Sequence, residues 1–546
     1  MLKHDEKSLQ EAMARNPHLR AYVERVTREW KKPIYVLELP LDLKVAKLEE
    51  INIIYPVGEP YFVHIRKKQG EEPMYIAIEP TYDKKDLEYF RKLYNKITKR
   101  VSILGQVPKD QDEFISTLIQ LTKEVTITED SPWRALEELV LGKVYIPKSK
   151  YKKIRELVIR ELAQFSTIEP LMRDPYIEDI SCIGTRPIWI VHKLFGSMKT
   201  NVQFKDEDEL EDFIYRTTEL LNRPATEVKP IVDAAMQDGS RLNVIYSQDI
   251  SIRGSSFTIR KFSRVPLSIT QLVKWNTLSP EEAAYFWLAI EAGSSVFICG
   301  ETAAGKTTTL NAITAFISPR ARIFSVEDTP EIYVPHKNWE RTITAEGKAE
   351  MYDLLKAALR ARPDYIIVGE IRGAEGYVAF QAMQTGHPVM STFHAGSVNS
   401  FIRRISGPPI NVSKEYIPNL NIVAIQQSVA REGKALRRMI SISEIERYHA
   451  PSGSIVTREV FVWDPVSDKH LFRAWYNSYV LEEIVAKTLG MTKEQVYEEL
   501  KVRAAIIRAL IERGYFNYFQ VFEMIRRYAE FGLEGLPFEV EVAEVT

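Results

Sequence analysis

The chain has 546 residues, 45% hydrophobic and 27% charged, with 73 basic residues against 74 acidic ones. This balance argues against dedicated nucleic-acid binding, and two cysteines, Cys182 and Cys299, exclude a disulfide framework or a zinc cage. No apolar run reaches the roughly 18 residues that span a bilayer, and the N-terminus shows no signal-peptide core, so we expect a cytosolic protein of about three or four domains.

Residues 1–32 are predicted to form a basic amphipathic helix, with eight Lys/Arg against five Asp/Glu. Such a helix either lies on the body of the protein or docks on a membrane surface or a partner, and the sequence leaves both open. Residues 33–130 are predicted to form an α+β domain. Its strand-like segments include "INIIYPV", "PYFVHIRKK" and "MYIAIEP", and two helices follow them.

Residues 131–262 are predicted to form a smaller α+β domain, mainly antiparallel, with helices in "KSKYKKIRELVIRELAQF" and "DELEDFIYRTTELLNR". Its last strands, "SRLNVIY" and "SFTIRKF", carry or flank Arg241, Arg253 and Arg260. Alone, these arginines would be exposed charges on strand edges. Phosphoryl transfer spreads charge over three oxygens, however, and an arginine from elsewhere can stabilise it, so they are also catalytic candidates.

Residues 263–448 alternate strands with helices, which is typical of a mostly parallel sheet with helices on both faces. The strands are predicted in "SVFIC", "RIFSVED", "YIIVGE" and "PVMSTFHA". Residues 449–546 are predicted to form a hairpin, "REVFVWDP" with "KHLFRAW", followed by a helical C-terminal extension. Ligands of such sheets bind at the carboxyl ends of the strands, where the chemical motifs also fall.

The stretch "GETAAGKTTT" lies between a buried strand and a helix and fits the pattern G-x-x-x-x-G-K-[ST]. In this Walker A loop, backbone N–H groups and the helix N-terminus surround a β-phosphate with positive partial charge. Lys306 would reach the β- and γ-phosphates of ATP, and the Thr307 hydroxyl would ligate Mg²⁺. The predicted nucleotide-binding residues are Gly300, Glu301, Thr302, Ala303, Ala304, Gly305, Lys306, Thr307 and Thr308.

Acidic and imidazole side chains follow three further predicted strands. Glu327 and Glu370 each end an apolar run, where a carboxylate can hold the Mg²⁺ shell or orient the attacking water. His394, at the end of "PVMSTF", could hydrogen-bond a γ-phosphate. The predicted metal ligands are Thr307, through its hydroxyl, and Glu370, whose carboxylate would bind Mg²⁺ through water. Asp328, Arg372 and His387 are further candidates near these positions.

Four of these stretches, in this order, make the chain resemble the type II/IV secretion ATPase superfamily: "GETAAGKTTTLNA", "FSVEDTPEI", "RPDYIIVGEIRGAE" and "TGHPVMSTFHAGS". Within that superfamily it looks most like the archaeal branch, the archaellum motor and archaeal type IV pilus or secretion ATPases. The resemblance covers residues 148–445 well, and the tail "VFVWDP" looks archaeal in particular. Many bacterial relatives carry a tetracysteine zinc element after the fourth stretch, but no cysteine follows Cys299 here.

The resemblance implies a RecA-like P-loop ATPase core that works as a homo-hexameric ring with ATP and Mg²⁺. It implies that arginines of the smaller domain reach the nucleotide from the same or an adjacent chain, with a hinge at Arg260–Thr270. The expected partners are a polytopic membrane platform protein and accessory cytoplasmic ATP-binding or ring proteins of a filament machinery. No nucleic acid is expected. The protein would lie in the cytoplasm, peripherally on the inner face of the membrane.

The favoured function is therefore the assembly, and in archaella the rotation, of a type IV pilus-like filament. A pilus or secretion ATPase and a DNA-transfer ATPase on the same fold remain open. So does a nucleotide-sensing scaffold with negligible turnover. The sequence also leaves open which of Glu327 and Glu370 activates water, and which arginine acts on a neighbouring chain.

Overall fold

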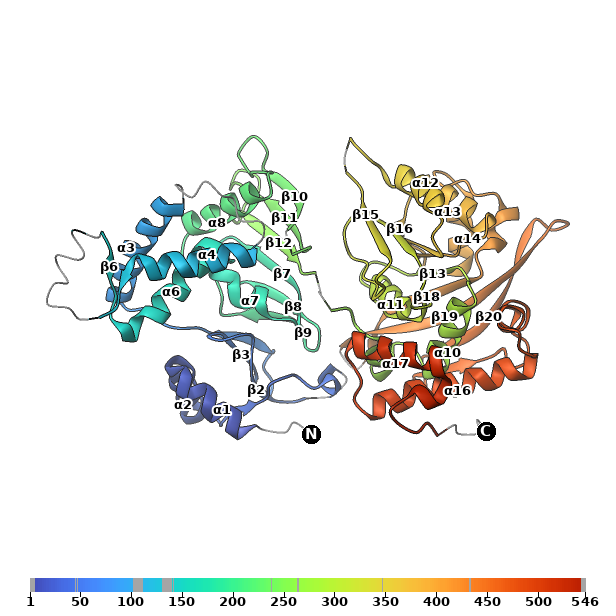
Figure 1. The fold of residues 1–546 in the computed structure, drawn as a ribbon, viewed down its shortest axis with the longest axis horizontal. Coiled ribbons are helices and arrows are strands. Elements are labelled where there is room, and N and C mark those ends of the chain that lie inside the picture. The colour runs from blue at the N-terminus through green and yellow to red at the C-terminus, as the bar shows by residue number, and fades with distance from the viewer. Residues whose placement is uncertain are drawn as a thin grey trace. The chain divides into compact units, whose positions relative to one another are not determined.

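The computed structural model describes residues 5–44, 46, 48–101, 111–129, 140, 142–236, 238–262, 265–345, 347–431 and 434–541. The chain divides into two compact units, Met1–Phe262 and Ser263–Thr546 (Figure 1). The finer predicted boundaries, after residues 32, 130 and 448, stay predictions.

One ten-stranded sheet organises the first unit. In spatial order its strands are β1 (Ile34–Tyr35), β2 (Ile51–Pro56), β3 (Phe62–Lys67), β4 (Met74–Ile78), β9 (Gly196–Thr200), β8 (Trp189–His192), β7 (Ile177–Ile183), β12 (Ser256–Arg260), β11 (Arg241–Ile245) and β10 (Ile231–Ala235). The pairs β1–β2 and β4–β9 are parallel and the others are antiparallel. Strands from residues 33–130 and from 131–262 thus lie in the same sheet.

Side chains of the last three strands alternate between buried and exposed positions, as expected of a sheet with one covered face. Helix α8 (Glu207–Leu220) covers that face. Its N-terminus is capped by Asp206, which accepts a hydrogen bond from the Glu209 amide at 3.0 Å. Phe213 of α8 packs against Phe257 of β12 with ring centroids 5.3 Å apart. Arg241 and Arg260 lie at exposed positions of their strands.

The predicted helix over residues 1–32 is broken in two, α1 (Glu6–Arg15) and α2 (Pro17–Glu29). Asn16 between them has extended backbone, because the proline that follows disfavours the helical conformation of the preceding residue. Leu9 and Leu19 belong to a buried cluster with strand residues such as Ile54. The apolar stripe of this segment therefore packs on the protein's own sheet.

The remaining elements of the first unit form a helical layer and a small sheet. They are α3 (Lys84–Val101), α4 (Gln111–Glu124), α6 (Lys148–Ala163), α7 (Glu169–Arg173), the short 3-10 helices Leu41–Lys44 and Ser166–Ile168, and the two-stranded sheet β5 (Thr126–Ile127) with β6 (Val144–Tyr145). Leu93 and Ile97 of α3, Leu118 of α4 and Ile154 and Val158 of α6 share one core.

A buried carboxylate, Asp174, joins the two halves of the ten-stranded sheet. It accepts hydrogen bonds from the hydroxyls of Tyr55 on β2, at 2.6 Å, and Tyr75 on β4, at 3.0 Å. The amide of Tyr176 donates to it as well, at 2.8 Å. Burial and the Asp174 charge raise the pKa of both tyrosines well above the ordinary value. These bonds matter because β4 and β9 pair at only two positions, Met74 with Lys199 and Tyr75 with Thr200.

The second unit is built on a nine-stranded sheet, which confirms the predicted α/β core. In spatial order its strands are β15 (Trp339–Ile343), β14 (Ile323–Glu327), β16 (Tyr365–Ile371), β17 (Val389–Phe393), β13 (Val296–Cys299), β18 (Ile422–Arg431), β19 (Lys434–His449), β20 (Ser454–Asp464) and β21 (Lys469–Phe472). The strands are parallel from β15 to β18, and antiparallel from β18 to β21. The predicted hairpin β20–β21 therefore continues the core sheet.

Helices cover this sheet. They are α9 (Ile269–Lys274), α10 (Pro280–Glu291), α11 (Lys306–Ile313), α12 (Met351–Ala361), α13 (Glu375–Gln384), α14 (Val398–Ser406), α15 (Ala486–Leu489), α16 (Lys493–Glu512) and α17 (Tyr518–Phe531), with a π-helix at Val480–Val485 and 3-10 turns at Thr314–Phe316, Lys414–Asn419 and Gly532–Gly535. All four residues of β13 are buried, as in a strand covered on both faces. No helix among the described residues combines the length and apolar character needed to cross a membrane.

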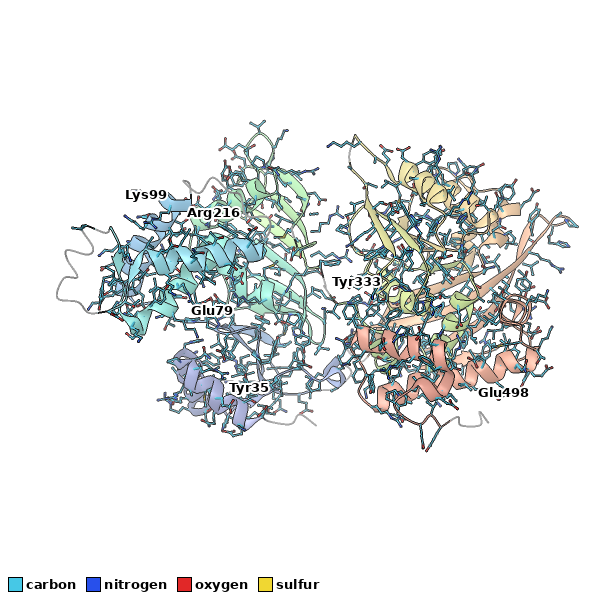
Figure 2. The ribbon with its side chains drawn as sticks, in the orientation of Figure 1. Tyr35, Glu79, Lys99, Arg216, Tyr333 and Glu498 are labelled. Atoms are coloured by element: carbon cyan, nitrogen blue, oxygen red, sulfur yellow. The ribbon has the colours of Figure 1, made fainter. Side chains whose placement is uncertain are left out.

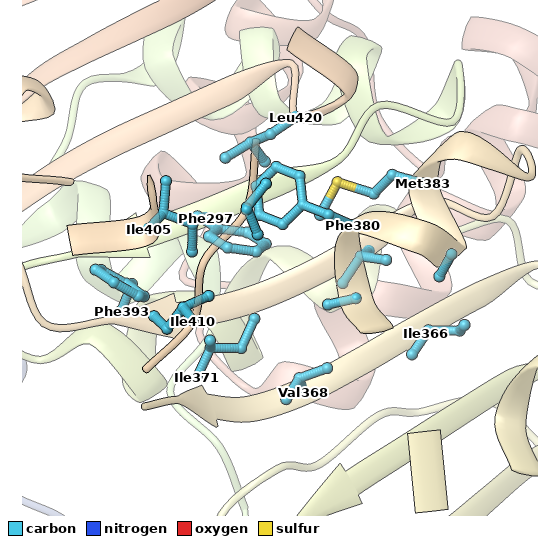
Figure 3. Close-up of a cluster of buried hydrophobic side chains, with 14 of the residues drawn as sticks. Phe297, Ile366, Val368, Ile371, Phe380, Met383, Phe393, Ile405, Ile410 and Leu420 are labelled. Carbon is cyan, nitrogen blue, oxygen red and sulfur yellow. The ribbon is translucent and has the colours of Figure 1, made fainter. Parts of the chain in front are cut away.

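Aromatic and aliphatic side chains fill the space between the sheet and its helices. Phe380 of α13 and Phe401 of α14 meet Phe297 of β13 edge to face, with centroids 6.1 Å and 5.9 Å away (Figure 3). The predicted helical C-terminal extension is confirmed, and α16 packs against α10 (Figure 1). Trp287 of α10 stacks on Phe316 at 5.5 Å and meets Tyr528 of α17 at 5.4 Å.

A buried ion pair ties the hairpin to α10. The Nδ1 atom of His470, on β21, lies 3.0 Å from a carboxylate oxygen of Glu282, and both side chains are buried. Burial alone would lower the pKa of His470, but the Glu282 charge and its hydrogen bond raise it, and the net shift is upward. Nearby, Arg438 forms a two-point ion pair with Asp468, at 2.8 and 2.9 Å.

The buried pair of His470 and Glu282 predicts that the stability of the fold depends on pH. Since the folded pKa of His470 lies above the unfolded value, the stabilisation is complete below about pH 6.5 and is lost as the pH rises through the folded pKa. The difference in free energy of unfolding between the wild type and His470→Gln should therefore stay constant below about pH 6.5 and shrink as the pH rises above that value. Calorimetric unfolding of both chains measures it, and a difference independent of pH would contradict the pairing.

Candidate functional site

The Walker A residues form a loop from β13 to α11 at the carboxyl ends of the parallel strands. The amide of Gly300 donates to the carbonyl of Phe393, at 3.2 Å. A Cβ atom at Gly300 would lie 2.1 Å from the carbonyl oxygen of Gln426, so no larger residue fits. Gly305 has a φ of 89°, a conformation that glycine adopts without strain, and it begins α11. The first turn of α11 thus points its free N–H groups into the loop.

Two residues that the sequence analysis missed brace this loop from strands β18 and β19. The side chain of Gln426 is buried, donates to the carbonyl of Ala304 at 2.8 Å, and accepts from the hydroxyl of Thr309 at 2.7 Å. Arg437 donates through Nε to the carbonyl of Ala303, at 3.3 Å. The only signal for Gln426 was an amide directly after the apolar run "IVAI".

Lys306 lies across the loop with its ammonium group 3.1 Å from the carbonyl of Glu301, to which it donates. Burial lowers the pKa of Lys306, while the carboxylates of Glu370 and Glu331 act in the opposite direction. Thr307 and Thr308, on the first turn of α11, are half-buried.

The structure brings Glu370, Arg372 and Asp328 together beside this lysine. A register shift between Val368 and Glu370 interrupts the pairing of β16 with β17, and such bulges re-aim side chains. Arg372 donates through Nε to Glu370, at 3.0 Å, and its guanidinium lies 3.3 Å from Asp328. Arg372 and Asp328 are exposed, whereas Glu370 is half-buried.

Glu327, at the end of β14, is fully buried and both carboxylate oxygens have partners. One oxygen accepts from the amides of Glu331 and Ile332, each at 2.6 Å, and the other pairs with Arg341 on β15, at 3.0 Å. Burial raises the pKa of Glu327, against the hydrogen bonds of Ile332 and Arg341, which lower it. In this arrangement Glu327 shapes the turn that follows it.

Glu331 is the acidic residue of this turn that the sequence analysis missed. Its backbone is held at both ends, since its amide donates to Glu327 and its carbonyl accepts from the Asn311 side chain of α11, at 2.9 Å. Its half-buried carboxylate acts on Lys306. The sequence signal was a third acidic residue, after Glu327 and Asp328, which a strand-end rule cannot pick out because it lies four positions beyond the end of the strand.

The two histidines lie at opposite ends of the same parallel strand, β17. His394 directly follows β17 and so lies beside Gly300, whose amide bonds the preceding residue, Phe393. His387 precedes β17, at the amino-terminal ends of the parallel strands. Its Nδ1 atom lies 3.1 Å from the Thr385 hydroxyl. His387 is thus separated from the phosphate loop by the length of the strand.

The arginine candidates belong to the first unit, where Arg241 and Arg260 lie together and Arg253 lies apart. Arg241 and Arg260 are register partners on the neighbouring strands β11 and β12. Arg241 forms a two-point ion pair with Asp233, at 2.9 and 2.7 Å. Arg253 lies in the connection between the two strands, at the other end of the hairpin, and is exposed. Of the predicted hinge, residues 263 and 264 lie outside the described residues.

The site fits a magnesium ion carried by a nucleotide. Among the described residues no group of three His, Cys, Asp or Glu side chains could hold a metal ion by itself. Mg²⁺ commonly binds through one or two protein oxygens together with substrate phosphates and keeps several waters. The Thr307 hydroxyl and the Glu370 carboxylate supply donors of that kind next to the phosphate loop.

An uncharacterized protein of Methanocaldococcus jannaschii is 46% identical over 549 residues, covering 98% of this chain and 99% of that protein. The conjugal transfer protein TrbB of Rhizobium radiobacter is 31% identical, over 42% of this chain and 72% of that protein. Among solved structures, the ATPase DotB of Legionella pneumophila matches with a TM-score of 0.39 and 18% identity, covering 67% of this chain and 91% of that one.

A family model described as "Type II/IV secretion system protein" matches residues 161–464, which is more than half of the chain. The resemblance stated from the sequence motifs is thereby confirmed, and the archaeal origin of the full-length relative supports the archaeal branch. The protein belongs to the type II/IV secretion system protein family.

Proposed function

We propose that the protein is a Mg²⁺-dependent ATP hydrolase that acts as a motor of a type IV pilus-like filament. The observation that carries the proposal is the phosphate loop itself, in which Lys306 begins α11 directly after Gly305 and the side chains of Gln426 and Arg437 brace the backbone. A positive group that meets the β- and γ-phosphates, next to acidic groups that can orient water, is the arrangement that phosphoryl transfer requires.

In this proposal Lys306 and the amides of residues 300–308 hold the phosphates. Thr307 and Glu370 would hold the Mg²⁺ ion, which when bound neutralises phosphate charge. Glu331 orients the attacking water from the turn that follows β14, whereas Glu327, one of the two sequence-based candidates with Glu370, holds that turn through its own hydrogen bonds. His394 would hydrogen-bond the γ-phosphate, and Asp328 and Arg372 would set the charge around Glu370.

Arg241 and Arg260 are the proposed arginines that stabilise the transferred phosphate, from the same or a neighbouring chain of a homo-hexamer. Their register pairing would deliver two guanidinium groups from one place, whereas Arg253 lies apart. Arginines in this role raise phosphoryl-transfer rates by about 10³–10⁵. We place His387 outside the catalytic step because it precedes β17, at the end of the strand opposite the phosphate loop.

The machine that we propose is a filament motor, most simply the archaellum. Its partners would be a polytopic membrane platform protein and accessory cytoplasmic ATP-binding or ring proteins, with the motor peripherally attached to the inner face of the cell membrane. Family membership and the archaeal relative support this assignment. Affinity capture from membranes, followed by identification of the co-purified filament subunit, tests it.

A DNA-transfer ATPase is the second candidate, because one relative is described as a conjugal transfer protein. The near-neutral charge of this chain weighs against it. Stimulation of hydrolysis by DNA that disappears with added salt would favour this candidate over a filament motor.

Replacing Lys306 by alanine should abolish phosphate release from Mg-ATP, because the group that meets the β- and γ-phosphates is lost. Lys274, the last residue of α9, gives a lysine control, Lys274→Ala, which should keep wild-type turnover. Steady-state phosphate release measures both. Turnover retained by the purified Lys306→Ala chain would refute the site.

Glutamine substitutions separate the roles of Glu331 and Glu327. Glu331→Gln should lower kcat by about 10²–10⁴ without lowering the unfolding temperature, since it removes the carboxylate that is proposed to act on water and leaves the backbone contacts of the turn in place. Glu327→Gln should instead lower the free energy of unfolding by about 1–3 kcal/mol, because a buried partner of Arg341 is lost. Phosphate release and thermal unfolding of both variants check this, and the reverse pattern would return the catalytic role to Glu327.

A further inference from the structure

The C-terminal helix α17 touches the helix that follows the phosphate loop. The side chain of Tyr518, the first residue of α17, is buried. Its hydroxyl lies 2.8 Å from the hydroxyl of Thr314 and 3.2 Å from the backbone carbonyl of Asn311. Thr314 in turn donates to the same carbonyl, at 2.7 Å. A residue more than 200 positions away in the chain thus contacts the end of α11 through its hydroxyl.

Asn311 carries this contact to the proposed catalytic turn. Its side-chain amide donates to the carbonyl of Glu331, at 2.9 Å, and its side-chain oxygen accepts from the amide of Tyr333, at 3.1 Å. Glu327 accepts from the amides of Glu331 and Ile332. The three successive amides of residues 331–333 are therefore held by Glu327 on one side and by Asn311 on the other.

Aromatic rings bind the same turn to α17. Tyr333, which is labelled in Figure 2, meets the rings of Tyr518 and Phe519 edge to face, with centroids 6.1 Å and 5.8 Å away. His336 packs against Phe522 at 5.2 Å. Edge-to-face pairs of this kind add attraction beyond the buried area. The turn that carries Glu331 therefore lies directly on the C-terminal helix.

We propose that Tyr518 is a positioning residue for hydrolysis, which acts through Asn311 on the backbone of Glu331. This inference rests on the proposed function and assigns the C-terminal extension a part in the reaction. The hydroxyl of Tyr518 fixes the end of α11, the Asn311 side chain at that end fixes residues 331–333, and Glu331 meets the water only when the turn is fixed. A small displacement of a reacting group is costly in rate, so this support matters for kcat.

The chain offers a matched pair of substitutions in one helix. Tyr518→Phe and Tyr528→Phe each remove one hydroxyl from α17, and Tyr528 donates to Glu499, at 2.8 Å, away from the proposed catalytic turn. We expect Tyr518→Phe to lower kcat about 3- to 10-fold, in keeping with the loss of one hydrogen bond, while Tyr528→Phe leaves kcat unchanged. The affinity for ADP, measured by titration calorimetry, should be the same in both variants and in the wild type.

Two further measurements separate positioning from simple packing. In the nucleotide-free chain, hydrogen exchange at the amides of residues 331–333 should be faster in Tyr518→Phe than in Tyr528→Phe. In a double-mutant cycle, Tyr518→Phe should have no further effect on kcat when combined with Glu331→Gln, because both act on the same group. Thr314→Val removes the hydroxyl's partner from the α11 side and should reproduce the effect if Tyr518→Phe folds poorly.

Equal kcat values in Tyr518→Phe, Thr314→Val and the wild type would overturn the inference and leave the proposed function standing. A decrease of the same size in Tyr528→Phe, or one that persists undiminished in the Glu331→Gln background, would also overturn it, since the effect would then be general destabilisation. A wild-type chain without ATP turnover would overturn the proposed function and this inference with it.

Discussion

The buried carboxylate of Glu327 sets the shape of the nucleotide site. A charged group enclosed by protein must be compensated by hydrogen bonds and an opposite charge. Two backbone amides of the next turn and the guanidinium of Arg341 provide that compensation. The chain leaving β14 is consequently forced to fold back over the carboxylate. This reversal fixes the backbone of Glu331, whose amide is one of the two donors, so a structural requirement of one acidic residue determines where a second one lies.

The phosphate loop depends on support from both neighbours of its strand. On one side β17 gives the carbonyl of Phe393 to Gly300 and places His394 beside the loop. On the other side β18 provides Gln426, whose side chain hydrogen-bonds both the loop, at Ala304, and α11, at Thr309. A central position of β13 between parallel strands is what makes such support possible. The loop is therefore preorganised to receive an anion without having to order itself first.

Much of this could be predicted from the sequence, because local patterns mark the strands and the loop. Apolar runs that end in Glu327, Glu370 and His394 place those residues at the carboxyl ends of parallel strands. The roles of Gln426 and Tyr518 could not be predicted, since each acts through hydrogen bonds to residues more than 100 positions away. The separation of Arg253 from Arg241 could not be predicted either, because it depends on the register of the hairpin. Long-range partners leave no periodic trace in a single sequence.

The bonds of Asp174 to Tyr55 and Tyr75 have a consequence for attempts to learn what the first 80 residues do by deleting them. A shortened chain would keep the aspartate but lose two of its hydroxyl donors and the parallel neighbour of β9. The new edge of the sheet would expose backbone groups that invite pairing with other chains. Aggregation or loss of activity in such a truncated protein would then reflect the disrupted sheet rather than the loss of a recognition module. Point substitutions on the surface of α2 test the function of this segment without disturbing the sheet.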